Sequence, residues 1–429
     1  MKNSQLSEDA RANLPGGVSH ELRYREPHPV FIARARGAEK WDVEGQRFID
    51  FKMGSASQML GHCHPAIVEA IQKQAEVSIF SADCHASEIE WAAWVNQLFP
   101  CAERTRFTAS GTEATMLALR LGRAWSGKDH VLRIDGHFHG WHDHALKGAK
   151  PGDARANSLG IPAALDELIH VCAADPQAME SALQDDHIGT VIVEASGANY
   201  GCVPLPTDTL RSLHDVARKA GVVLIFDEII TGFRWSPGGR QARDGIVPDL
   251  TTLAKIVTGG LPGGAVCGRA DIMELMNNTT RRGGFAPAVS HKGTFNGAPL
   301  VAAAACAAMP LLATGDVQAH ADAMADRMRA GMNASMEAAG VKGMAYGDSS
   351  AFHLHFGRDN LNGLTSAQIR GLPKAQVKAY RDGMLARGVD MMAYTSGLTS
   401  VAHTPALIDE ALGAFRETLA DMTRGGVLR

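Results

Sequence analysis

Short apolar runs alternate with amphipathic stretches through the middle of the chain. The runs that predict strands are rich in β-branched residues and span 131–134, 190–194 and 222–226. Such runs are typical of strands that are covered on both faces of a sheet. Two stretches, 112–125 and 208–220, carry apolar residues at helical spacing, and Gly221 follows the second as a helix stop. This alternation predicts an α/β domain with a largely parallel sheet.

The pattern changes toward both ends of the chain. Residues 31–35 and 41–51 predict short antiparallel strands. Beyond roughly residue 300, alanine-rich helices precede predicted strands at 351–356 and 388–392 and a closing helix at 404–423. We therefore expect three parts, which are an N-terminal segment (1–55) packing with the small domain, a large domain (56–300) and a small α+β domain (301–429).

Composition narrows the class of protein. The chain has 42 Lys and Arg against 46 Asp and Glu, a net charge of −4, whereas nucleic-acid binding needs clustered positive charge. Its seven cysteines are scattered without a CxxC pair, which favours a reducing cytosol over a disulfide framework. No apolar signal core and no uncharged apolar stretch of ~20 residues is present. We expect a cytoplasmic protein that binds neither nucleic acid nor membranes.

Glycine is over-represented, with 45 residues in 429. The average is about 7 % of a chain. The glycines follow no collagen period and form no linker. An excess of this kind marks tight turns or backbone that approaches a ligand closely.

A carboxylate pair follows one predicted strand. The run 222–226 ends in Asp227 and Glu228, and open α/β sheets bind ligands at the carboxyl ends of their strands. A carboxylate there can coordinate a metal, pair with a cation or keep a ring nitrogen protonated. A solvated strand end explains the pair equally well.

A single lysine closes the next apolar segment. Lys255 follows 250–254 and precedes Gly259, Gly260, Gly263 and Gly264. A partly desolvated lysine is a nucleophilic amine that can form a Schiff base with a carbonyl. A lone lysine is more often a surface residue, but the glycines favour a ligand nearby.

Small polar residues open the helix predicted at 112–125. Ser110, Gly111 and Thr112 stand where free N–H groups meet the positive end of the helix dipole, so they predict an anion or phosphate cradle. A simple N-cap by Ser110 or Thr112 is the alternative, and in isolation the more frequent one.

Four histidines occur within the segment 137–144, at positions 137, 139, 142 and 144. Their alternation along a loop does not aim all four at one point, and His62 with His64 is no better as a zinc site. We therefore expect no metal ion. Phe138, between Gly136 and Gly140, is interpreted as a flat platform for a ring.

Together these signals describe one ligand, an aromatic ring with a basic nitrogen, a phosphate and an aldehyde. Asp227 would take the ring nitrogen, Ser110 to Thr112 the phosphate, Phe138 the ring face and Lys255 the aldehyde. That ligand is pyridoxal 5′-phosphate.

Nine short motifs then identify a resemblance. In chain order they are 14–18, 41–45, 61–65, 110–114, 138–140, 191–194, 227–234, 253–255 and 293–297. The sequence resembles the class III aminotransferases, which are fold-type I pyridoxal-phosphate enzymes. Within them it is similar to the branch around glutamate-1-semialdehyde 2,1-aminomutase and the transaminases of D-aryl and β-amino acids. The resemblance implies a large domain with a mostly parallel central sheet and a smaller α+β domain.

The resemblance also implies roles for particular residues. Lys255 and Asp227 are the expected catalytic residues. The expected cofactor-binding residues are Ser110, Gly111, Thr112, Phe138, His139, Glu194, Asp227, Ile229, Lys255 and Thr294. By family analogy Thr294 would reach the phosphate from the neighbouring subunit of a homodimer.

Substrate residues are implied less directly. Arg23 and Asn199 match positions in that branch, Arg23 being the one that binds a substrate carboxylate, and an exposed arginine is the alternative for Arg23. Trp141, His20 and Tyr394 are expected to form pocket walls.

Several activities are compatible with these residues. We expect transfer of an amino group between an amino acid (aromatic, D- or β- among the options) and a keto acid, through a Schiff base on Lys255. An aminomutase is the closest alternative, a racemase or epimerase the next, and a non-catalytic cofactor-binding protein the last. Two departures weaken the aminomutase alternative, since Ser19–His20 replaces the Asn-Ser of that pattern and 393–403 lacks an acidic residue.

Overall fold

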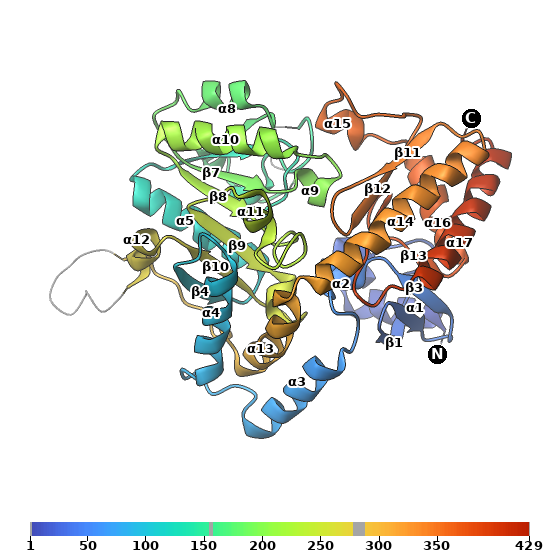
Figure 1. Cartoon of the computed structure of the whole chain (residues 1–429), viewed down its shortest axis with the longest axis horizontal. Helices are drawn as coiled ribbons and strands as arrows, with labels where there is room; N and C mark the ends of the chain where they lie inside the picture. The colour runs from blue at the N-terminus through green and yellow to red at the C-terminus, as the bar shows by residue number, and fades with distance from the viewer. Residues whose placement is uncertain (1, 154–157, 278–287, 429) are drawn as a thin grey trace. The chain divides into compact units, whose positions relative to one another are not determined.

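The computed structural model describes residues 2–153, 158–277 and 288–428 (Figure 1). These residues form two compact units. We call the one made of Pro65–Ala319 and Asn362–Gly371 the central unit. The other, made of Met1–His64, His320–Leu361 and Leu372–Arg429, is the terminal unit.

These boundaries differ from the ones expected at residues 55 and 300. Helix α13 (Pro299–Ala313) lies in the central unit, because it packs against α3 (Pro65–Val77) and α4 (Ala86–Leu98). Residues Asn362–Gly371 also return to the central unit. An apolar sequence indicates that a helix is buried, but it does not say against which unit.

A seven-stranded sheet organises the central unit. Its strands, in spatial order, are β4 (Arg104–Thr108), β10 (Gly264–Gly268), β9 (Leu250–Ala254), β8 (Val223–Asp227), β7 (Ile188–Glu194), β5 (His130–Ile134) and β6 (Ile169–Cys172). Neighbours from β9 to β6 pair in parallel, whereas β10 is antiparallel to both β9 and β4. The sheet is therefore mostly parallel, which confirms the expected fold class.

Strand β10 is a strand of this sheet that the sequence pattern does not predict. The glycines around 263 and 264 suggest a turn, yet Gly264–Gly268 is a fully buried strand. A Cβ atom at Gly264 would lie 2.8 Å from the carbonyl oxygen of Ser110. Glycine is thus needed there for a close backbone approach, not for a turn.

Helices cover both faces of the central sheet. Helix α5 (Gly111–Ser126) packs on one face, and α8 (Pro176–Ala182) and α10 (Thr207–Ala220) pack on the other (Figure 1). In β7 the side chains alternate, with Ile192 in the α5 cluster and Val191 in the α10 cluster. Burial of an apolar side chain such as these stabilises the unit by roughly 1.5–3 kcal/mol.

The remaining short elements of the central unit connect the strands. They are α6 (Asp143–Leu146), α7 (Ala164–Leu168), α9 (Ala198–Gly201), α11 (Gly239–Asp244), η3 (Lys255–Thr258), α12 (Ala270–Met273), η4 (Glu274–Met276) and α15 (Ser366–Ile369). Three of them, α6, α9 and η3, follow the carboxyl ends of β5, β7 and β9 and so lie at the edge where the sequence predicts a ligand.

Two smaller sheets build the terminal unit. One contains β1 (Ile32–Arg36), β2 (Glu39–Asp42), β3 (Arg47–Asp50) and β13 (Val389–Asp390), and the other contains β11 (Gly343–Tyr346), β12 (Ala351–Phe356) and β14 (Ser396–Leu398). Since β13 pairs with β3 in parallel, residues from the two ends of the chain share one sheet.

The helices of the terminal unit are α1 (Asn3–Asn13), η1 (Pro15–Gly17), η2 (Glu21–Arg23), α2 (Met53–Ala56), most of α14 (Asp316–Ala338), α16 (Lys374–Ala386) and α17 (Pro405–Arg424). Helix α14 carries a buried stripe of methionines four residues apart, at Met324, Met328, Met332 and Met336. This spacing puts all four on one helix face, where they pack into one core with Phe352 and Phe415.

A buried ion-pair network joins β2, β3 and β13. The Lys40 ammonium lies 2.7 Å from Asp50 and 2.8 Å from Asp390. His62 bonds the other oxygen of Asp50 at 2.8 Å, and Lys52 lies 3.0 Å from Asp390. Burial alone would raise the pKa of Asp50, but the charges and hydrogen bonds of Lys40 and His62 together outweigh burial and hold that pKa below its usual range.

Among the described residues, no single helix combines the length and hydropathy of a membrane span. The helices α13 and α14 meet that criterion only when they are taken together as a bent pair.

Candidate active site

The carboxyl ends of β8 and β9 bring Asp227 and Lys255 to the same sheet edge. The strands are parallel neighbours, with Asp227 opposite Thr252, and Lys255 follows β9 directly as the first residue of η3. Lys255 has a φ of +57°, a left-handed conformation that is costly for a lysine and concentrated at functional sites. The strand order therefore brings together two residues 28 positions apart (255 − 227).

The Lys255 amine is prepared for chemistry near neutral pH. Burial lowers its pKa to about 8, even though Asp227 and Glu194 act in the opposite direction. A substantial fraction of such an amine is neutral at pH 7 to 8, so it can act as a nucleophile or as a base.

Asp227 is buried and held from two sides. Its Oδ2 lies 2.7 Å from His139 Nδ1, and its Oδ1 accepts a hydrogen bond of 3.1 Å from the Ile229 amide. Burial raises the pKa of Asp227 to about 7, against the effects of the Ile229 amide and Lys255. A nearby cation would stabilise the ionised carboxylate.

His139 completes this arrangement. Burial, with the charge of Arg133, holds its pKa well below the usual value, so the ring is neutral and its Nδ1–H donates to Asp227. Its Nε2 is buried and has no hydrogen-bond partner among the residues that the structure describes. An orphaned buried atom of this kind next to Asp227 is consistent with a ligand that supplies the partner.

The loop that carries His139 is anchored to helix α5. The Thr115 hydroxyl donates to the carbonyl of His139 at 2.6 Å, and a Cβ on Gly140 would lie 2.8 Å from Thr112 Oγ1. Gly140 has a φ of +98°, so glycine is favoured there both by conformation and by space. The fully buried guanidinium of Arg133 donates to the carbonyls of His137 and Ala145 and holds both ends of the loop.

Glu194 fastens this loop to the start of α9. Its carboxylate accepts the amide of Phe138 at 2.6 Å, of Asn199 at 3.1 Å and of Tyr200 at 3.2 Å. Burial raises the pKa of Glu194 to about 7, against these three hydrogen bonds. In the structure Glu194 therefore positions backbone, and Phe138 is left with half of its surface exposed.

The start of α5 meets the ends of β8 and β9. Ser110 is the N-cap, and its hydroxyl accepts the Glu113 amide at 3.2 Å, as the alternative interpretation of this motif predicted. A Cβ on Gly111 would lie 2.9 Å from Ile229 Cδ1 and 3.2 Å from Ala254 Cβ. The positive end of a 16-residue helix therefore lies beside the residue that precedes Lys255, which suits an anion.

The four histidines of 137–144 have separate partners. Those partners are the Glu194 amide for His137, the Asp227 carboxylate for His139, the Thr115 hydroxyl for His142 and the Arg123 guanidinium for His144. They act as separate ties within the loop and do not converge on one point.

The other expected site residues are more scattered. In the central unit, Trp141 is 75 % exposed, Thr294 is exposed, and Asn199 Nδ2 is buried with no partner in the described part of the chain. His20, Arg23 and Tyr394 belong to the terminal unit, whereas Lys255 belongs to the central unit. His20 and Arg23 line a cavity of about 520 Å³, which Lys52 and Arg381 also line.

The sequence alone does not identify three residues that support the site. Arg133, Thr115 and His137 shape the loop beside Asp227, and none was expected to do so. Arg133 leaves the clearest signal, a charged residue among the buried apolar residues Val131, Leu132 and Ile134 of β5. Its partners are backbone carbonyls, which no sequence pattern identifies.

The residues present fit pyridoxal phosphate. They offer an amine with a lowered pKa, a buried carboxylate, a helix N-terminus at Gly111 and two orphaned buried nitrogens, on His139 and Asn199. These are the groups that an aldehyde, a ring nitrogen and a phosphate require.

Comparison with known proteins agrees with a site for pyridoxal phosphate. The family model for class-III aminotransferases matches residues 22–344. The glutamate-1-semialdehyde 2,1-aminomutase of Methanothermobacter thermautotrophicus is 34 % identical over 436 residues, covering 98 % of this chain and 100 % of that protein. An ω-transaminase from Sphaerobacter thermophilus superposes with a TM-score of 0.91 at 31 % identity, covering 98 % of both chains.

A β-phenylalanine aminotransferase from Variovorax paradoxus superposes with a TM-score of 0.87 at 27 % identity, covering 99 % of this chain and 95 % of that one. The similarity thus extends over both units and over nearly the whole length of each protein. The chain belongs to the class III aminotransferases, and it is a pyridoxal-phosphate-dependent enzyme of fold type I.

Proposed function

We propose that the protein transfers an amino group from an amino acid to a keto acid, with Lys255 as the covalent attachment point of the cofactor. The observation that carries this proposal is the meeting of Lys255, Asp227 and the start of α5 at one edge of the central sheet. An aromatic, D- or β-amino acid is a suitable donor.

Bound pyridoxal phosphate supplies an electron sink that makes a proton on the substrate carbon acidic. Lys255, whose pKa is about 8, would be free to act as a base once the amino donor has taken its place on the cofactor, and it would carry that proton from the substrate carbon to the aldehyde carbon of the cofactor, C4′. Asp227 keeps the ring nitrogen protonated, and His139 and the Ile229 amide hold its carboxylate in place. Without Asp227, the protonated ring nitrogen would be a buried positive charge without its partner.

The substrate residues remain part of the proposal. Arg23 would bind the substrate carboxylate, and its place in a cavity with Lys52 and Arg381 supports an anionic ligand. Asn199 would assist it, and Trp141, His20 and Tyr394 would shape the pocket.

We test the attachment point by reducing the holoenzyme with borohydride and mapping the modified peptide by mass spectrometry. The label is expected on Lys255, and Lys255→Ala is expected to remove both label and turnover. Lys219→Ala is the matched control, because Lys219 is an exposed lysine of the same unit paired with Glu180. A label on another lysine would refute the assignment.

A homodimer with Thr294 acting across the interface is also proposed. Mixed dimers of Lys255→Ala and Thr294→Ala subunits give the test. If Thr294 serves the partner's site, one of the two sites in each mixed dimer is intact and shows full activity. If Thr294 serves its own site, no site in the mixed dimer is intact.

An aminomutase is the second candidate, and the names of the curated relatives favour it over intermolecular transfer. The two differ in whether a second substrate is needed. Transfer from an amino donor to pyruvate or 2-oxoglutarate supports our proposal. Conversion of glutamate-1-semialdehyde without an acceptor, together with no net transfer, would replace it. Racemisation of a single enantiomer without an acceptor would indicate the third alternative.

A further inference from the structure

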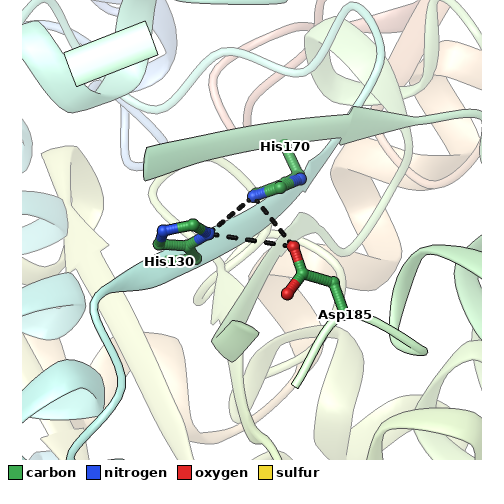
Figure 2. Close-up of side chains that lie close together, drawn as sticks. All are labelled: His130, His170 and Asp185. Atoms are coloured by element: carbon green, nitrogen blue, oxygen red, sulfur yellow. Dashed lines mark hydrogen bonds and ion pairs between the residues drawn. The ribbon is translucent and has the colours of Figure 1, made fainter. Parts of the chain in front are cut away.

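A second cluster of metal-ligating side chains lies on the central unit, at the edge of the sheet opposite to Asp227. Figure 2 shows His130, His170 and Asp185 pointing toward one another. His130 and His170 lie near the amino ends of β5 and β6, whereas Asp227 lies at the carboxyl end of β8. The cluster is therefore separate from the active site.

The sheet register explains why the two histidines meet. Leu132 of β5 pairs with His170 of β6, and His130 precedes Leu132 by two residues. Alternate residues of a strand share a face, so His130 and His170 project on the same side of the sheet. Strand β6 is the edge strand, so these side chains stand at the border of the sheet.

Asp185 reaches the pair from the turn between α8 and β7. That turn is closed by a hydrogen bond of 3.1 Å from the Ile188 amide to the Asp185 carbonyl. It is tied to β5 by a second hydrogen bond of 3.2 Å, from the His130 amide to the His187 carbonyl. Three segments distant in sequence are thus held against one another by backbone contacts.

The three candidate ligand atoms have spacings close to those around a tetrahedral ion. His130 Nδ1 lies 2.9 Å from His170 Nε2, and Asp185 Oδ2 lies 3.9 Å and 3.6 Å from these two nitrogens. Zinc bonds of about 2.0–2.2 Å place tetrahedral ligands roughly 3.4 Å apart. Shifts of about half an ångström would therefore complete the coordination.

The Asp185 carboxylate is oriented to bind a metal ion. Asp185 Oδ1 accepts two hydrogen bonds from His187, from Nδ1 at 2.8 Å and from the amide at 3.0 Å. This leaves Oδ2 facing the two rings at distances too long for hydrogen bonds. A ligating carboxylate fixed by an outer hydrogen bond is typical of metal sites.

Solvent can reach the cluster. The side chains of His130, His170 and Asp185 are 23 %, 32 % and 33 % exposed. Water can therefore supply a fourth ligand, and an ion can enter without unfolding the sheet. Two imidazoles and one carboxylate in this geometry favour zinc over magnesium or calcium, which prefer oxygen ligands.

We propose that His130 Nδ1, His170 Nε2 and Asp185 Oδ2 bind a zinc ion, with water as the fourth ligand. The ion would fasten the edge strand β6 to β5 and to the turn before β7. None of these three ligands belongs to the segment 137–144 or to the pair His62 and His64. The site is therefore distinct from the histidines for which we expected no metal.

Zinc titration of the holoenzyme, freed of metals with a chelator, tests the site. The wild-type protein is expected to bind one zinc ion more than His170→Ala or Asp185→Asn. The dissociation constant of that ion is expected to rise by at least about 100-fold in either variant, since loss of even an outer-sphere partner costs roughly 10–100-fold. His214→Ala is the matched control, because His214 is a partly buried histidine of the same unit paired with Asp215.

Equal zinc uptake by all four proteins, or no uptake by the wild type, would overturn the proposal and leave a hydrogen-bonded histidine pair. Retained turnover in the variants shows that they fold. Anomalous scattering at the zinc edge from soaked wild-type crystals gives a second measurement. A peak between the three ligand atoms supports the site, and a peak only elsewhere contradicts it.

Discussion

His139 and Asp227 form a buried contact of 2.7 Å between Nδ1 and Oδ2 that joins the histidine-rich loop to the end of β8. The two residues are 88 positions apart. Because the histidine is neutral and only donates its Nδ1–H in a hydrogen bond, it forms no ion pair with the carboxylate, and the cofactor ring nitrogen is the cation that Asp227 is expected to pair with. Asp227 is thus oriented by the protein on one side and is expected to act on the cofactor on the other.

Asp227→Asn tests this role while preserving the shape of the side chain. The neutral amide no longer holds a proton on the ring nitrogen, so kcat is expected to fall on the order of 10²–10³-fold, as for other lost electrostatic contacts at reaction centres. Asp215→Asn, at an exposed aspartate, is the control and should leave kcat unchanged. A kcat of Asp227→Asn close to that of the wild type would contradict the role.

Thr115→Val tests the anchor of the loop. Valine has nearly the same shape but no hydroxyl, so the buried carbonyl of His139 loses its hydrogen bond. The free energy of unfolding, measured with denaturant, is expected to fall by about 1–3 kcal/mol. The cofactor dissociation constant should rise several-fold, because the loop carries Phe138 and His139.

Thr115→Ser is the matched variant, since it keeps the hydroxyl and removes only a methyl group. It should keep the cofactor dissociation constant near the wild-type value. A similar loss of affinity in both variants would show that packing, and not the hydroxyl, positions the loop.

Gly140→Ala tests the close approach of the loop to α5. Its φ of +98° strains an alanine, and the new Cβ would lie 2.8 Å from Thr112 Oγ1 and 3.0 Å from Thr112 Cα. Strain contributes roughly 1–2 kcal/mol, and overpacking typically adds about 1–3 kcal/mol. Thermal unfolding and cofactor titration should both show the loss.

Gly127→Ala separates these two effects. Gly127 has a φ of +68°, and no atom lies within 4 Å of the position that an alanine methyl group would take, so only the strain remains. We expect a smaller loss of stability and unchanged cofactor affinity. If both glycine variants behaved alike, the contact with Thr112 would be irrelevant.

The buried network around Lys40 predicts acid sensitivity of the terminal unit. The folded state holds the pKa of Asp50 below its usual value near 3.8, so the unfolded chain binds more protons as the pH falls toward 4 and below. The stabilisation by Asp50 is therefore fully present above about pH 5 and is lost progressively at lower pH. Asp50→Asn should flatten the dependence of the unfolding free energy on pH across this window.

Asp409→Asn is the control for that measurement. Asp409 pairs with Arg327 at 2.7 Å, but both side chains are about half exposed, and such pairs contribute little. The unfolding free energy of Asp409→Asn should change with pH at the same slope as that of the wild type. An unchanged slope in Asp50→Asn would mean that the network does not govern acid unfolding.

The sequence by itself determined the local elements and the principal chemistry. Apolar runs and helical spacing marked β5, β7, β8, α5 and α10, because burial of a face imposes a period that can be counted along the chain. Asp227 and Lys255 were identifiable because each follows a strand directly, and the ends of parallel strands meet at one edge. The motifs around them identified the family.

Only the tertiary structure decided which distant segments meet. It inserted β10 as an antiparallel strand, assigned α13 to the central unit, turned His139 toward Asp227 and brought His130, His170 and Asp185 together. Each of these outcomes depends on strand order, register and loop path. Hydrophobic periodicity encodes how deeply a residue is buried but not which neighbour it is buried against, so these contacts cannot be read from local pattern.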